Sequence, residues 1–79
     1  MKNGGGMVEP NAKITIDEAQ AKLHKDLAVI HSAPCVVEAN GRPRTAYEFL
    51  CRYGEEQYLV YIDAKTGDEI SILNTRELA

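Results

Sequence analysis

The segment Tyr58–Leu73 constrains the fold most, because two β-rich runs flank a connection that contains glycine. The runs are Tyr-Leu-Val-Tyr-Ile and Ile-Ser-Ile-Leu, and Asp-Ala-Lys-Thr-Gly-Asp-Glu joins them. This pattern predicts a β-hairpin whose turn needs a left-handed residue, which Gly67 supplies. The carboxylate of Asp63 can accept hydrogen bonds from the backbone amides of the turn. We therefore predict that Asp63 and Gly67 are structural turn residues.

The length and composition fit one small domain with a modest core. The chain has 79 residues, of which 44% are hydrophobic and 27% are charged. A domain of this size buries a smaller share of its surface than a larger one, so we expect modest stability. The net charge of -3 argues against nucleic-acid binding, which needs a clustered basic surface. No apolar run of the sequence approaches the roughly 20 residues that span a bilayer.

Residues 1–12 differ from the rest of the chain because they contain three consecutive glycines and no apolar stretch. Such a segment predicts a flexible leader, in part of cloning origin. Residues 13–74 carry the patterns of regular structure and form the predicted domain. Residues 75–79 are predicted to be a tail, and we expect the chain to fray from Asn74 onwards.

A helix is predicted directly after the leader. Thr15 is its expected N-cap, and Glu18 three residues later completes a capping box. We expect the helix to end near Lys25. So short a helix is marginal in isolation, and its apolar stripe must therefore pack on another element. The stripe consists of Ile16, Ala19, Gln20 and Leu23, with Leu27 just beyond it.

The rest of the domain has the features of an antiparallel sheet. An extended segment over residues 27–39 is interrupted at Pro34, which cannot donate to a ladder and indicates an edge strand or a bulge. Asn40–Pro43 is a predicted turn, and alternation over Thr45–Tyr53 predicts a strand with one buried face. The expected fold class is α+β, with one N-terminal helix packed on a three- to four-stranded antiparallel meander. The remaining strands are expected over residues 57–62 and 68–73.

No set of residues predicts a metal site or a cofactor site. His24 and His31 have no carboxylate or cysteine partners at the spacing of zinc ligands. Asp63, Asp68 and Glu69 do not follow the alternate-position spacing of an EF-hand loop. We interpret these three acids as turn-forming and solvating residues. The sequence thus predicts no metal-binding residue, no cofactor-binding residue and no cofactor.

The two cysteines do not predict catalysis. Cys35 and Cys51 are too few for a disulfide framework, and their spacing matches no common zinc pattern. Cys51 is two positions from Phe49 on the predicted strand and therefore lies on the same, buried face. Burial there raises a thiol's pKa and suppresses its reactivity. We favour two free core cysteines over a disulfide. We predict no catalytic residue, and a small cysteine-dependent enzyme is the less favoured alternative.

Four tyrosines are the side chains best suited to contact a partner. They are Tyr47, Tyr53, Tyr58 and Tyr61, on or near the central hairpin. Amphipathic aromatic rings are enriched at protein interfaces, which makes these four a candidate partner-contact surface. The alternative is that they build the core, because the chain has one Phe and no Trp.

The order of the predicted elements resembles that of a PepSY domain. The helix start Ile-Thr-Ile-Asp-Glu-Ala at residues 14–19 precedes a strand pair, and the hairpin at residues 58–69 follows. Tyr-Glu-Phe at residues 47–49, followed by that hairpin, is similar to the C-terminal PepSY unit of YpeB-like spore germination proteins. The resemblance covers residues 14–73.

This resemblance implies a non-enzymatic, extracytoplasmic module associated with the spore membrane and cortex. The implied partner is a SleB-like cortex-lytic enzyme, a peptidoglycan hydrolase that the module stabilises or restrains. The full-length protein is then expected to be membrane-anchored, and this part of it soluble. The alternatives are a PepSY propeptide-like module that inhibits a peptidase and a structural spacer between domains.

Overall fold

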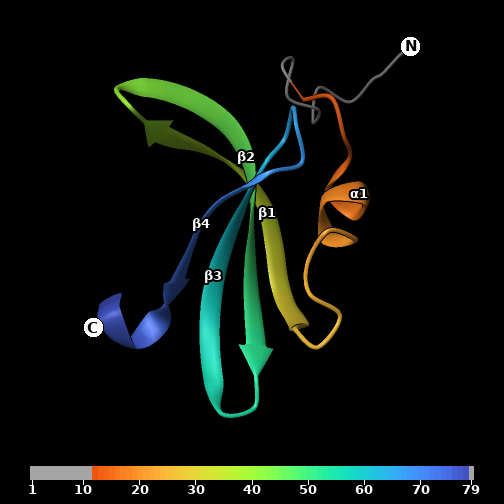
Figure 1. Ribbon diagram of the computed structural model, residues 1–79, viewed down its shortest axis with the longest axis vertical. Coiled ribbons are helices and arrows are strands. Elements are labelled where there is room, and N and C mark those ends of the chain that lie inside the picture. Colours follow the sequence, from red (N-terminus) through yellow and green to blue (C-terminus); the bar gives the residue numbers. More distant parts are fainter. Residues whose placement is uncertain (1–11, 79) are drawn as a thin grey trace.

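The computed structural model describes residues 12–78 as a small α+β unit (Figure 1). Four strands form one antiparallel sheet in the order β1-β2-β3-β4, so each strand lies beside its neighbours in the sequence. The predicted leader lies outside the described residues except for Ala12, which packs against the core. The elements are α1 (Ile16–Gln20), β1 (Ala28–Ala39), β2 (Arg42–Tyr53), β3 (Glu56–Asp63), β4 (Glu69–Asn74) and the 3-10 helix η1 (Thr75–Leu78).

Helix α1 begins with the predicted capping box but ends earlier than predicted. The Thr15 hydroxyl accepts a hydrogen bond from the Glu18 amide at 3.1 Å, and the Glu18 carboxylate accepts one from the Thr15 amide at 2.8 Å. The prediction that the helix reaches Lys25 is wrong, because from Lys22 onwards the described backbone hydrogen bonds of this segment are i→i−3 turns. These tighter turns carry the chain into a segment whose apolar side chains, Leu23 and Leu27, pack against the core.

Two-residue loops join the first three strands. Asn40 and Gly41 connect β1 to β2, and their φ angles of 55° and 76° are the positive values that a type I′ turn requires. Gly54, with φ of 62°, opens the loop between β2 and β3. The turn predicted over Asn40–Pro43 is therefore confined to its first two residues. Strand β2 begins at Arg42, three residues before its predicted start.

Strand β1 lies at one edge of the sheet, where Pro34 is tolerated. Pro34 pairs with Tyr47 inside a continuous ladder. The predicted interruption of the strand at Pro34 is therefore wrong, whereas the predicted edge position is confirmed. An edge strand has one side without a ladder partner, and a residue that lacks an N–H group fits there. The one shift in the β1–β2 register lies between Val29 and His31.

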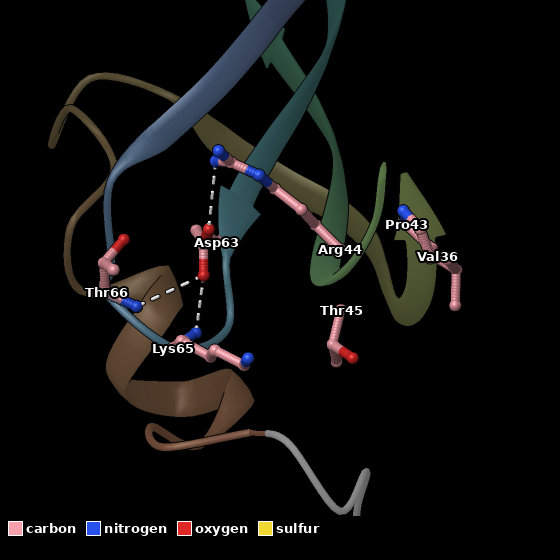
Figure 2. Close-up of a pocket in the computed structure, with 7 residues that line it drawn as sticks. All are labelled: Val36, Pro43, Arg44, Thr45, Asp63, Lys65 and Thr66. Atoms are coloured by element: carbon pink, nitrogen blue, oxygen red, sulfur yellow. Dashed lines mark hydrogen bonds and ion pairs between the residues drawn. The ribbon is translucent and has the colours of Figure 1, made fainter. Parts of the chain in front are cut away.

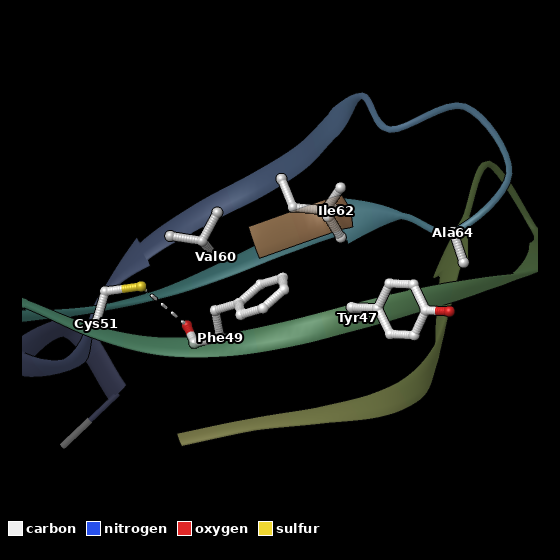
Figure 3. Packing of buried hydrophobic residues seen from close by; sticks show 7 residues of the cluster. Tyr47, Phe49, Cys51, Val60, Ile62 and Ala64 are labelled. Atoms are coloured by element: carbon white, nitrogen blue, oxygen red, sulfur yellow. Dashed lines mark hydrogen bonds between the residues drawn. The ribbon is translucent and has the colours of Figure 1, made fainter. Parts of the chain in front are cut away.

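The core lies between α1 and one face of the sheet. Successive strand residues point to opposite faces, so alternate residues of β2 and β3 are buried together. Figure 3 shows these side chains on one side of the two strands. Ala19 is the fully buried residue of the helix, and Ile16 packs against the same cluster. The strand residues of the core are Tyr47, Phe49, Cys51, Val60 and Ile62.

Ala64 joins three parts of the chain just after β3. Its amide donates to the carbonyl of Thr45 at 3.0 Å, which fixes the end of β3 against β2. Its carbonyl accepts from the amides of Lys13 and Ile14, at 2.8 and 3.0 Å, which fixes the segment that leads into α1. The Tyr47 hydroxyl adds a hydrogen bond to the Ile14 carbonyl at 2.7 Å. The start of the helix is therefore attached to the sheet by backbone and side-chain bonds.

Contacts with Glu56 lie next to the segment that follows Asn74, where fraying stays a prediction. Residues 75–78 form η1, and the Arg76 guanidinium lies 2.6 Å from the Glu56 carboxylate. The Asn74 side chain donates to the same carboxylate at 3.0 Å and accepts from the Arg76 amide at 2.9 Å. Glu56 at the start of β3 thus contacts both Asn74 and Arg76. The sequence pattern did not indicate this contact, because it joins residues that are distant in sequence.

We expect Tyr47→Phe to lower the free energy of unfolding by about 1 kcal/mol, because the Ile14 carbonyl loses its hydroxyl donor. Urea denaturation followed by circular dichroism measures this change. Tyr53→Phe is the matched control on the same strand. Tyr53 is 55% exposed, so its variant should stay within about 0.5 kcal/mol of the parent. Equal losses in the two variants would contradict an anchoring role for the Tyr47 hydroxyl.

Candidate functional site

The face of the sheet opposite α1, which we call the open face, is the candidate site. Residues paired directly across antiparallel strands point to the same side, so the register defines which side chains share this face. Two leucines of the open face are half-buried, and the third, Leu73, is 37% exposed. Together they form the leucine row across β2, β3 and β4, which consists of Leu50, Leu59 and Leu73.

A hydrogen-bonded polar pair lies beside the leucine row. The Tyr61 hydroxyl donates to the Glu48 carboxylate at 2.6 Å, between residues directly opposite each other on β2 and β3. This hydrogen bond, followed by burial and the charge of Glu48, raises the pKa of Tyr61 to about 12. The phenol is therefore a neutral donor at physiological pH, and it holds the carboxylate in one position. The open face thus combines apolar side chains with one oriented carboxylate.

The four predicted contact tyrosines do not form one surface. Tyr47 is a core residue, and Tyr58 is half-buried against the same core. Tyr61 lies on the open face, three residues from Tyr58 and therefore on the other side of β3. Tyr53 is exposed at the end of β2. The structure thus distributes the four tyrosines over the core, the open face and the exposed end of β2.

Asp63 organises the turn of the final hairpin. The Asp63 carboxylate accepts from the amides of Lys65 and Thr66, at 2.7 and 3.2 Å, and its carbonyl accepts from Gly67 at 2.8 Å. Gly67 has φ of 82°, the positive value that favours glycine. The Asp63 amide closes the turn by donating to the carbonyl of Asp68 at 2.8 Å.

Arg44 completes the environment of the buried Asp63 carboxylate. One guanidinium nitrogen lies 3.4 Å from its second oxygen, and Asp63 is nearly inaccessible to solvent. A buried carboxylate that is paired with a cation and accepts amide hydrogen bonds is a stable arrangement. The turn context in the sequence predicts the role of Asp63, but no local pattern indicates Arg44, which lies 19 positions earlier.

The cysteines lie on opposite faces of the sheet and are both free. Cys35 pairs with Ala46 on the open face, and Cys51 belongs to the core. Ala46 and Cys51 are five positions apart on β2, which corresponds to roughly 17 Å along a strand. Because Cys35 lies beside Ala46, a disulfide between Cys35 and Cys51 is excluded in this fold. Burial raises the pKa of both thiols, and the charge of Glu48 adds to the effect at Cys35.

The histidines show no metal-binding arrangement. The His24 ring accepts from the Asp26 amide at 3.1 Å in an exposed loop, whereas His31 lies on β1. Among residues 12–78, no three His, Cys, Asp or Glu side chains converge in a way that could hold a metal ion. The same range contains no helix with the length and apolar character needed to cross a membrane.

A comparison with solved structures identifies the fold. The chain superposes on the Bacillus megaterium YpeB C-terminal domain with a TM-score of 0.78 and 24% sequence identity. The match covers 90% of this chain and 32% of that one, so this chain spans about a third of the matched structure. The chain therefore has a fold found in the YpeB C-terminal domain, as the sequence resemblance implies. No family model and no curated protein matches the sequence.

Tyr61 should be the last tyrosine to ionise, at a pH of about 12, in an ultraviolet titration of the phenols. Glu48→Gln should move this step toward 10, because the amide is a weaker acceptor and carries no charge. A raised folded-state pKa stabilises the fold below pH 10, and this stabilisation is lost as the pH rises to 12. The variant should therefore show a flatter stability profile over that window. A step near 12 that persists in Tyr61→Phe would assign it elsewhere.

Iodoacetamide should alkylate both cysteines slowly at neutral pH, because their raised pKa values keep them as thiols. We expect Cys35 to react before the fully buried Cys51, and faster as the pH rises. Glu48→Gln should accelerate only Cys35, since it removes the nearby negative charge. Mass spectrometry of the labelled peptides measures both rates. Rapid labelling of Cys51 in the native protein would support a nucleophilic role for it.

Proposed function

We propose that this chain is a PepSY module of a YpeB-like spore germination protein and that it binds a protein partner without catalysing a reaction. The fold shared with the Bacillus megaterium YpeB C-terminal domain carries this proposal. The element order and the residue pattern over residues 14–73 point the same way. The proposed partner is a SleB-like cortex-lytic hydrolase, which the module stabilises or restrains outside the cytoplasmic membrane.

The open face provides the physical route to such binding. The leucine row offers apolar area that a partner can remove from water, and burial of apolar area is the main driving force of association. Leu73 is on edge strand β4, so a partner can also reach the row from the side of the sheet. The oriented Glu48 carboxylate lies in the adjacent row and can fix the partner's position through a charged donor.

The thiol chemistry supports a binding module over a cysteine-dependent enzyme. A nucleophilic cysteine needs a nearby base and a lowered pKa. Cys51 bonds weakly to the Phe49 carbonyl at 3.8 Å, inside an apolar cluster. Cys35 faces Glu48, whose charge opposes thiolate formation. Neither environment activates a thiolate.

Adjacent residues of β4 give a matched test of the open face. Leu73 belongs to the leucine row, whereas Ile72 pairs with Val60 on the other face and is 47% exposed. We expect Leu73→Glu to weaken binding of a purified SleB-like hydrolase about tenfold or more, because it buries a charge in the interface. Ile72→Glu should leave the affinity unchanged within about twofold. Calorimetry with the folded variants measures both.

Amide spectra must first show that both variants keep the native fold. A loss of affinity in Ile72→Glu alone would place the contact on the face that carries α1. If the amide spectrum of the unsubstituted domain does not change at a high micromolar concentration of the hydrolase, direct binding by this module is refuted. If the module instead inhibits a peptidase, as a propeptide does, the peptidase should cleave its substrate more slowly when the module is present.

A further inference from the structure

We propose that a cleft at one end of the sheet binds the free carboxyl terminus of a short peptide. The cleft has a volume of about 460 Å³ and lies where the β1–β2 hairpin extends beyond the end of β3 (Figure 2). It is distinct from the leucine row, since Arg44 and Leu50 are six positions apart on β2, roughly 20 Å along a strand. The inference therefore does not depend on a hydrolase binding the open face.

The charges that line the cleft favour an anion. Arg44 and Lys65 are two exposed cations, and Asp63 is the single acid among the lining residues. The Asp63 carboxylate is buried and already accepts two amide hydrogen bonds in addition to its contact with Arg44. Arg44 uses one nitrogen for that contact, and a guanidinium has five N–H donors. The cleft is thus locally positive in a chain whose net charge is -3.

A buried hydroxyl in the cleft adds an unused polar group. Thr45 is 8% exposed, and its side chain makes no hydrogen bond to the other residues in the described range. Its backbone carbonyl is occupied by the amide of Ala64 at 3.0 Å, but the hydroxyl remains able to donate and accept. A buried polar group without a partner is unfavourable, so a ligand that supplies one is stabilised at this position.

The shape of the cleft favours a chain end over a passing strand. Ala46 and Asp63 form the last β2–β3 pair toward the hairpin, so the preceding residues of β2 have no β3 partner. Pro43 lies in this part of β2, which pairs with β1 but not with β3. It has no N–H to donate, which disfavours the addition of a strand there. Pro43 and Val36, which is 64% exposed, offer an apolar wall for a small side chain. A terminal carboxylate can meanwhile pair with Lys65 or with Arg44, the two cations of the lining.

The probe is acetyl-trialanine with a free carboxylate, titrated into the isotope-labelled chain while amide resonances are recorded. We expect saturable shifts at Thr45, Lys65 and Thr66, with binding about tenfold weaker for the C-terminal amide of the same peptide. Equal binding of acid and amide would overturn the proposal. Inorganic phosphate that binds as tightly as the peptide would also overturn it, because the cleft would then be a simple anion site.

Two substitutions test the named residues. Thr45→Val keeps the shape of the side chain and removes a hydroxyl that makes no described hydrogen bond, so the fold should be retained. Thr45→Val should weaken peptide binding about fivefold, and so should Lys65→Ala. Lys25→Ala is the matched control, because Lys25 is an exposed lysine that does not line the cleft. Unchanged affinity in both cleft variants, or an equal loss in the control, would contradict the assignment.

Discussion

The position of α1 depends on the hydrogen bonds of Ala64 more than on the helix itself. A five-residue helix forms too few internal bonds to offset the cost of nucleation. The Ala64 carbonyl instead holds the two residues before the N-cap, while its amide holds β2. The hydroxyl of Tyr47 supports the same segment from within the core. One backbone position therefore connects the helix, the central hairpin and the last turn, and the core face of the sheet is covered as a result.

Features with a local cause were the ones that the sequence predicted well. The Thr15–Glu18 capping box involves residues three positions apart, and the Asn40–Gly41 loop follows from the tolerance of both residues for positive φ. The end of α1 could not be found in this way, because no glycine or proline marks it. It depends on how Leu23 and Leu27 pack against the sheet, which is a tertiary contact.

The candidate site was harder to predict because it depends on strand register. The loop between β2 and β3 has two residues, whereas the strands predicted over Thr45–Tyr53 and residues 57–62 leave three residues between them. With the shorter loop, Glu48 falls directly opposite Tyr61. The same register separates Tyr58 from Tyr61 by face, which divides the tyrosines that composition alone grouped together. The sequence pattern therefore predicts which segments form strands, but neither their exact bounds nor the surface that they present.

The Tyr61–Glu48 pair limits what can cover the open face. A partner that spans both the leucine row and this pair removes a carboxylate from water, and that carboxylate has only the phenol as its described hydrogen-bond donor. Burial of such a charge is unfavourable unless the partner supplies further donors. A purely apolar partner is thus restricted to Leu50, Leu59 and Leu73, whereas one with an arginine or lysine opposite Glu48 can use the wider face. The polar pair therefore selects among partners that the leucine row alone would accept equally.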